Sequence, residues 1–542
     1  MRAERIYSLL KDFMALPTVT GTADENLALP FYQNFFEQCP YFRERPDHWG
    51  TWLCPEDRFH RKVMWGLVRG KSPRTVVLIH HMDVVDVTQY ERYQKLAYLP
   101  DGIKPILQNG SLPVSDDVKG DLDGEDWIFG RGACDMKAGT AIEMTLLEEY
   151  AAQEDVPGSL LLLAVPDEET GSAGMRAAAS LFEALEKKFG LQFTLMVDTE
   201  PHGRTQENAY VIHDGSIGKM MPVVLARGKS VHLGNVYDGL NPIHLMSALA
   251  RETELWPEMV ERRGNTTTPG ATWLSLRDRR TAYNVSLPAT AGGYLNVLTL
   301  THTPKDVLHA LCRSAAVAGA KVIASMKERY AFYRIQTPEA PADPFPAQVQ
   351  VLTFGALKQA VLSHDPEAIS IEAPILKRVQ AGACDLREGA LELMEAYLAR
   401  WESTDPCFVI GLAAPYYPPV NNSELSTQSM TNRMVSHLSE TLQSFGLELQ
   451  VDNYFKGICD LSYAMFTADA STIDFVAKNL VFWGEAYEIP LALIQRYSMP
   501  VFNIGPWGKD LHNLGERVNR KDLIEHTPAL IQRVIEDAWN EA

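Results

Sequence analysis

An α/β fold with a mostly parallel central sheet is predicted by two features of this 542-residue sequence. Short apolar runs at residues 74–81, 159–166 and 192–198 have the length and composition of buried strands. Segments with helical periodicity, at residues 136–152 and 174–189, separate these runs. Strand–helix–strand alternation is typical of parallel sheets, because a crossover helix returns the chain to the starting edge.

After residue 215 the pattern changes to that of a second, α+β unit with antiparallel character. Residues 218–228 predict a strand and residues 241–255 a helix. Residues 282–304 predict two further strands, and a long helix is expected over 305–331.

A Pro-rich segment at 337–346 precedes a mostly helical stretch and a strand at 407–419. We therefore expect a main domain interrupted by an inserted one. The main domain would occupy residues 1–214 and 421–542, and the insert 215–420, with a helical extension at about 345–403.

The formal net charge of −19 argues against a nucleic acid or an anionic membrane as partner, because both favour excess Lys and Arg. No stretch reads as long and apolar enough to span a membrane. The seven cysteines include no C-x-x-C pair, which fits a reducing compartment, so a cytoplasmic location is expected.

Acidic and imidazole side chains follow each of the early apolar runs, and an acidic residue also precedes the helix at 136–152. In an open α/β sheet, ligands gather beyond the carboxyl ends of the strands, so these groups should converge. Carboxylates clustered with few imidazoles repel one another, and one or two divalent metal ions would relieve this. The residues are His80, His81, Asp83, Asp135, Asp167, Glu168, Glu169, Asp198 and Glu200.

Each motif has an ordinary alternative when taken alone. A single H-x-D after an apolar run is usually a loop, and a single D-E-E is usually a solvated turn. Asp135 could cap the helix that follows it. Four such ends in order favour the metal site. Competing motifs are absent: there is no H-E-x-x-H or G-x-S-x-G, and neither G-K-S has the upstream glycine of a phosphate-binding loop.

Five ordered segments resemble the signature blocks of the M20 family of di-zinc peptidases and deacylases. They are "HHMDVVD", "GRGACDMKAG", "PDEETGSAG", "DTEP" and "GPWGKDLHNLGERV", which together span residues 81–518. The inserted domain, "GSIGKMMPVVLARGKSVHLGN" and "KGICDLSY" look similar to the arginine-utilisation (RocB-like) branch. The resemblance implies a zinc-peptidase-type catalytic domain with an inserted lid and dimerisation domain.

The resemblance implies two zinc ions per subunit, with Co²⁺ or Mn²⁺ as substitutes. His81 and Glu200 would bind the first ion, with Asp198 as a substitute for Glu200. Glu169 and His512 would bind the second, and Asp135 would bridge both. Without the resemblance, His512 would be interpreted as a surface histidine.

The remaining roles also come from the resemblance. Glu168 would be the general base, and the carboxylate of Asp83 would orient His81. In dimeric members the histidine that matches His232 enters the neighbouring subunit's site and stabilises the oxyanion, so a homodimer is expected. An exposed loop position is the alternative for His232. The family pattern also predicts a cis peptide bond after Asp135.

Some positions depart from the family pattern. His80 replaces a glycine and Asp86 a proline, and neither is a predicted ligand. Leu461 and Ser462 stand where many members carry an arginine after the aspartate of "GICDLSY". The strand "GGYLNVLTL" also lacks an arginine that many members use. A free carboxylate on the substrate is therefore left without a predicted partner.

The leading hypothesis is zinc-dependent hydrolysis of an amide bond in a small N-acyl amino acid or short peptide, in arginine or ornithine catabolism by branch resemblance. A non-catalytic, metal-binding member with a regulatory role is the second. The general base Glu168 argues against it. A phosphoesterase is the third, and the sequence shows no basic anion pocket that would favour it.

Overall fold

A computed structural model describes residues 2–540, whose contacts divide into two compact units. Unit 1 comprises Met1–Ile217, Val420–Thr467 and Pro490–Ala542, and unit 2 comprises Gly218–Pro419 and Ala468–Ile489. Residues 468–489, which were predicted to belong to the main domain, thus pack with the insert.

Unit 1 is built on an eight-stranded, mostly parallel mixed sheet, so the α/β prediction is confirmed. The antiparallel pairs lie at β1–β2, β2–β5 and β18–β7. In sheet order the strands are β1 (Trp49–Leu53), β2 (Lys62–Val68), β5 (Ser159–Val165), β3 (Arg74–His81), β6 (Gln192–Asp198), β18 (Val501–Asn503), β7 (Ala209–His213) and β17 (Glu448–Asp452).

The four neighbours β5, β3, β6 and β18 are all parallel. β3 and β5 are buried along nearly their whole length, as expected for β-branched and leucine-rich strands covered on both faces. Their carboxyl ends therefore lie along one edge of the sheet, and the chain turns there into the predicted site residues.

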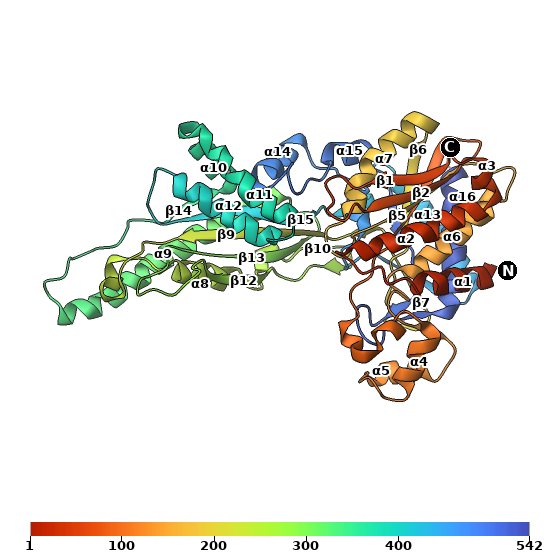
Figure 1. The fold of residues 1–542 in the computed structure, drawn as a ribbon, viewed down its shortest axis with the longest axis horizontal. Helices are drawn as coiled ribbons and strands as arrows, with labels where there is room; N and C mark the ends of the chain where they lie inside the picture. Colours follow the sequence, from red (N-terminus) through yellow and green to blue (C-terminus); the bar gives the residue numbers. More distant parts are fainter. Residues whose placement is uncertain (1, 541–542) are drawn as a thin grey trace. The chain divides into compact units, whose positions relative to one another are not determined.

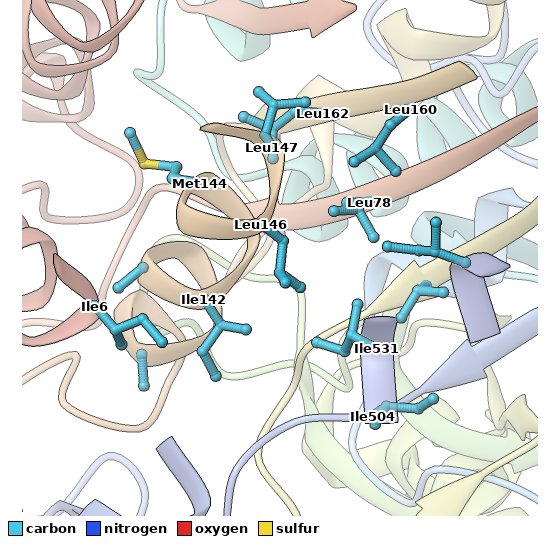
Figure 2. Close-up of a cluster of buried hydrophobic side chains, with 14 of the residues drawn as sticks. Ile6, Leu78, Ile142, Met144, Leu146, Leu147, Leu160, Leu162, Ile504 and Ile531 are labelled. Carbon is cyan, nitrogen blue, oxygen red and sulfur yellow. The ribbon is translucent and has the colours of Figure 1, made fainter. Parts of the chain in front are cut away.

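Helices cover both faces of this sheet. Figure 1 shows α7 on one side of β1 and β2, and α2 and α6 on the other. Figure 2 shows part of the larger core, with Leu78 of β3, Ile142 of α6 and Ile531 of α16 among its labelled side chains. The helices of unit 1 are α1 (Arg2–Met14), α2 (Ala28–Gln38), α3 (Pro40–Glu44), α4 (Pro100–Gln108), α5 (Asp116–Leu122), α6 (Lys137–Ala151), α7 (Ala173–Phe189), α13 (Gln428–Ser444), α15 (Leu491–Arg496) and α16 (Thr527–Asn540).

A small antiparallel sheet joins two distant parts of unit 1. Its strand order is β19 (Gly508–Lys509), β20 (Arg517–Asn519) and β4 (Trp127–Phe129). β20 pairs with β4, so the loop after residue 129 lies beside the loop before residue 517. These loops carry Asp135 and His512, respectively. A further short pair in unit 1 is β8 (Gly215–Ser216) with β16 (Val420–Asn421).

Unit 2 is a five-stranded sheet with helices on both faces. Figure 1 shows α8 and α9 on one side and α10 and α12 on the other. The strand order is β12 (Thr272–Asp278), β13 (Thr290–Thr299), β9 (Gly218–Arg227), β15 (Cys407–Tyr417) and β14 (Gln350–Thr353), with β10 (Arg262–Arg263) and β11 (Thr266–Thr267) as a separate pair. The helices are α8 (Pro242–Thr253), α9 (Pro304–Gln336), α10 (Phe354–His364), α11 (Glu372–Gln380), α12 (Leu386–Arg400) and α14 (Ala470–Asn479).

Two local predictions for unit 2 differ from the structure. The region 282–304 contains one strand, β13, because residues 282–289 form an irregular loop in which Tyr283 is 82% exposed. β13 pairs instead with β9 and with β12. The side chains of β12 are only partly buried, and its sequence lacks a continuous apolar run. The helical extension begins with β14, which pairs in parallel with β15.

The helix α9 is long and apolar enough to cross a membrane by length and composition, which corrects the expectation that no such stretch exists. It begins at a capping box formed by Thr303 and Asp306. Half of its apolar window is buried, and it packs against α8, β14 and β15. These contacts are those of a core helix of unit 2.

Candidate metal centre

His81 is the last residue of β3, and its ring is fully buried at the carboxyl edge of the sheet. Its Nδ1 donates to the main-chain oxygen of Asp83 at 2.9 Å. This fixes the ring and directs Nε2 to Asp135 Oδ1 at 3.0 Å and Glu200 Oε1 at 3.4 Å. A histidine held in this way presents a free Nε2 lone pair to a metal ion.

Asp135 lies between the two predicted histidine ligands. Its Oδ1 faces His81 Nε2 and its Oδ2 faces His512 Nε2, each at 3.0 Å. A carboxylate that uses one oxygen toward each imidazole has the arrangement expected of a bridging ligand. The peptide bond after Asp135 is cis, as the sequence resemblance predicted.

A buried ion pair between Arg131 and Glu516 positions this bridge. Glu516 Oε1 accepts hydrogen bonds from the main-chain nitrogens of Cys134 and Asp135, at 3.4 and 3.5 Å. Arg131 Nη2 donates to the main-chain oxygen of His512 at 3.1 Å. The pair therefore ties both metal-site loops together. Arg131 and Glu516 lie in two of the segments that resemble the family, "GRGACDMKAG" and "GPWGKDLHNLGERV". Nothing in the sequence of either segment predicted that they pair.

The Asp83 carboxylate has a different contact from the expected one. It lies 3.7 Å from His81 Nδ1, whose hydrogen bond goes to the Asp83 main chain instead. Each carboxylate oxygen accepts a main-chain N–H at 3.2 Å, one from Glu168 and one from Glu169. Asp83 therefore holds the turn that carries these two glutamates, because the short Asp side chain reaches that turn directly.

The same turn is anchored at its start by Asp167. Asp167 Oδ1 lies 2.6 Å from Arg61 Nη1, and its main-chain nitrogen donates to Glu25 at 2.8 Å. Its Oδ2 accepts from the nitrogen of Ala173, in the first turn of α7. Asp167 is thus a structural residue, and it leaves Glu168 and Glu169 to face the site.

Burial and mutual repulsion shift the ionisation of the cluster. Burial, and next the charge of Asp135, raise the pKa of Glu200 to about 7. Burial raises the pKa of Glu168 well above its usual range. The neighbouring carboxylates of Asp135 and Glu169 raise the pKa of His512 to about 10. The carboxyl groups of the cluster therefore cannot all be ionised at neutral pH unless cations are bound beside them.

The donor atoms fit divalent metal ions. Two overlapping groups have ligand atoms within 4.8 Å of one another: His81 with Asp135 and Glu169, and His81 with Glu168 and Glu200. Glu169 Oε1 lies 3.0 Å from His512 Nε2 but makes no hydrogen bond with it or with any other described residue. A buried carboxylate oxygen without a hydrogen-bond partner calls for an explanation, and a bound cation would supply one. Imidazole and carboxylate are ligands that suit zinc.

His80 points to the opposite face of β3 from His81, where it joins a fully buried chain of hydrogen bonds. Tyr32 Oη lies 2.8 Å from Nε2 and Glu143 Oε2 lies 2.7 Å from Nδ1. Thr199 Oγ1 donates to the other oxygen of Glu143 at 2.9 Å. Burial lowers the pKa of His80 to about 3 and raises that of Glu143, so both groups are neutral. The histidine that replaces the family's glycine thus has a packed polar partner on α6.

Three further residues of the sequence prediction have contacts of their own. Asp198 is buried, and the group of converging ligand atoms around His81 and Glu168 includes Glu200 and not Asp198. His232 lies in unit 2 and is exposed, and its Nδ1 accepts a hydrogen bond of 3.1 Å from the nitrogen of Gly234. Asp460, which follows Cys459 in "GICDLSY", is buried with neither carboxylate oxygen hydrogen-bonded to a described residue.

The profile of the family described as Peptidase family M20/M25/M40 matches residues 77–532. The chain belongs to this family. The match covers all the predicted metal ligands of the cluster, so the family resemblance of the sequence is confirmed. M20 members are peptidases and amidohydrolases, and this chain is a hydrolase-family protein with candidate metal-ligand groups.

Relatives extend this family assignment over nearly the whole chain. The chain is 28% identical to protein YqjN and 25% identical to protein RocB of Bacillus subtilis; each alignment covers 98% of this chain, with 96% of YqjN and 94% of RocB. Succinyl-diaminopimelate desuccinylase of Burkholderia multivorans is 27% identical over 39% of this chain and 49% of its own.

Solved structures of M20 proteins share the fold. The M20 family metallo-carboxypeptidase Sso-CP2 of Sulfolobus solfataricus superposes with a TM-score of 0.51 at 14% identity, over 98% of both chains. At this identity the likeness is evidence for the fold alone.

Proposed function

We propose that this M20 protein hydrolyses an amide bond in a small N-acyl amino acid or short peptide, and that it uses two zinc ions. The observation that carries the proposal is Asp135, whose two oxygens face His81 and His512. The name of the desuccinylase relative, which denotes removal of an acyl group, supports an N-acylated substrate.

Residues of unit 1 would hold the two metal ions. His81 and Glu200 would hold one ion, Glu169 and His512 the other, and Asp135 both. Bound there, the metal would polarise the scissile carbonyl and lower the pKa of water.

Glu168 is the general base in this proposal. It takes a proton from water and delivers it to the leaving amine. Burial, which raises its pKa, suits a carboxyl that must hold that proton between the two steps. Asp83 keeps Glu168 in place by accepting the hydrogen bond of its main-chain nitrogen.

His232 would act from unit 2 as the oxyanion donor of a homodimer, in the neighbouring subunit's site. Because Nδ1 accepts the N–H of Gly234, the neutral ring carries its proton on Nε2. Nε2 is therefore the donor available to a developing oxyanion. One such donor contributes about 3–4 kcal/mol to the stability of the transition state.

A role in arginine or ornithine catabolism in the cytoplasm is the finer part of the proposal, and it rests on the RocB-like resemblance. The test is metal analysis of zinc-reconstituted protein together with an activity screen over N-acyl amino acids and dipeptides. Turnover of an N-acyl amino acid with two bound zinc ions supports the proposal. Two bound ions without turnover of any substrate favour the non-catalytic alternative, and turnover of phosphate esters alone favours a phosphoesterase.

A further inference from the structure

The helical extension of unit 2 contains a cavity of about 360 Å³ that none of the predicted catalytic residues lines. It lies among α10, α11, α12 and the chain from α14 to residue 485, all of which belong to unit 2. Its volume is within the range of small-molecule sites.

Most of the residues that line the cavity are apolar, and the helices that carry them pack closely. α10 is fixed against the end of α14 by a hydrogen bond of 3.0 Å from the nitrogen of Gly355 to Asn479 Oδ1. A side chain at Gly355 would meet the main-chain oxygen of Lys478 at 2.9 Å, so this close approach needs glycine. The main apolar wall residues are Phe354, Leu362, Leu393, Phe482 and Trp483.

Glu372 is a buried carboxylate in this apolar setting, with only 5% of the residue exposed. Lys358 Nζ lies 2.7 Å from its Oε1, and the buried Tyr397 hydroxyl donates to the same oxygen. The charge of Lys358 is therefore already balanced by Glu372.

Glu485 adds a second carboxylate to the cavity and has no ion pair with any described residue. Burial, and next the charge of Glu372, raise the pKa of Glu485. The remaining cation of the lining, Lys478, is already neutralised, because its Nζ lies 2.6 Å from Asp474 Oδ2. Among the described lining residues, both lysines are thus paired with a carboxylate, and the Glu485 carboxylate has no cation of its own.

We propose that this cavity binds a small organic cation, an alkylammonium or guanidinium compound, whose charged group lies between Glu372 and Glu485. Its carbon chain packs against Phe354, Phe482 and Trp483. Charge-assisted hydrogen bonds to the carboxylates and contact with aromatic faces both favour a cation here. An anion of the same size would face two carboxylates.

The test compares three probes that share a five-carbon chain: n-pentylammonium, 1-pentanol and valerate. Each is titrated calorimetrically into the zinc-loaded, full-length protein at pH 7 and low salt. We expect saturable binding of n-pentylammonium only. Glu485→Gln should weaken it about tenfold or more, as expected for loss of a hydrogen bond to a charged group. The control Glu367→Gln, at an exposed position of the same extension, should leave binding unchanged.

A second, steric variant locates the probe independently of charge. Ala477 lines the cavity, and Ala477→Phe should abolish binding by filling it. This variant still decides the question if Glu485→Gln fails to fold. Valerate or pentanol binding as tightly as n-pentylammonium would overturn the proposal. So would unchanged binding in Glu485→Gln or Ala477→Phe, or the absence of saturable binding of n-pentylammonium.

Discussion

Arg131 donates a hydrogen bond of 3.1 Å to the main-chain oxygen of His512, although 381 positions separate them in the chain. Because Glu516 pairs with Arg131 and receives the N–H of Asp135, a change in this pair should disturb the metal ligands without touching them. Glu516→Gln should lower zinc affinity about 10–100-fold, the usual cost of losing a group that orients a ligand. Competition with a zinc chelator measures it. Glu525→Gln, nearby and exposed, is the control, and equal affinities in the two variants would contradict the positioning role.

Zinc should bind in two equivalents and stabilise the fold. Asp135→Asn should reduce the stoichiometry, because the bridging carboxylate serves both ions. At a free zinc concentration a thousand times the Kd, the expected stabilisation is about 4 kcal/mol. Elemental analysis and thermal unfolding with and without zinc measure these effects. An Asp135→Asn variant that still binds two ions with wild-type affinity would rule out the bridge.

Glu168→Gln should retain metal and lose hydrolysis. The amide keeps the shape of the side chain but cannot accept the proton of water, which should cost about 10²–10⁴ in rate. Turnover of the best substrate and metal content are measured on the same preparation. Unchanged turnover would mean that another carboxylate is the base.

The neutral His80–Glu143 pair should give a distinctive pH dependence to the metal-free protein. The pKa of His80 is about 3 in the folded protein, below its unfolded value of 6.5. The stability that His80 contributes is therefore fully present above pH 6.5 and is lost as the pH falls toward 3.

The cost of His80→Gln, measured by urea unfolding in EDTA, should consequently shrink by about 1.4 kcal/mol per pH unit below pH 6.5. The variant must be compared with wild type at each pH. Glu143 has a raised pKa and contributes the opposite slope above its own unfolded value, so wild type alone conceals the effect. The exposed His364→Gln is the control. A cost of His80→Gln that is constant from pH 6.5 to 4.5 would mean that the pair is ionised.

A mixed dimer tests whether His232 acts across subunits. Glu168→Gln and His232→Ala homodimers should each be nearly inactive. If His232 serves the neighbouring subunit, one site of the hybrid carries both defects and the other carries neither, so activity should return. A hybrid that stays inactive would place His232 in its own chain's site, and sedimentation as a 60.5 kDa species would exclude the dimer.

The strand-end ligands were predictable because β3, β5 and β6 are apolar runs whose polar ends stand out in the sequence. β3 and β6 begin and end at the expected residues. The edge strand β1 gave no such signal, since its side chains are half-exposed and lack an apolar run. β12 was missed for the same reason.

The residues that position the ligands were harder to predict from the sequence than the ligands themselves. The contacts of Arg131 with Glu516, and of His80 with Glu143, join residues far apart in the chain, and neither pair forms a local pattern. From the family resemblance, the Asp83 carboxylate was predicted to orient His81. In the structure it accepts the main-chain N–H of Glu168 instead. Periodicity and composition report on burial, and they do not report on which polar groups meet.

The place of β18 in the central sheet has a consequence for how the protein is made. β18 pairs with β6, yet roughly 300 residues separate them, and unit 2 lies largely between the two in the chain. A ribosome adds roughly 5–20 residues per second, so β6 waits roughly 15–60 seconds for its neighbour. His512 emerges later still. The nascent chain therefore exposes an open strand edge beside unshielded carboxylates, and the proposed ion that needs both Glu169 and His512 could bind only after translation has passed β18 and β19.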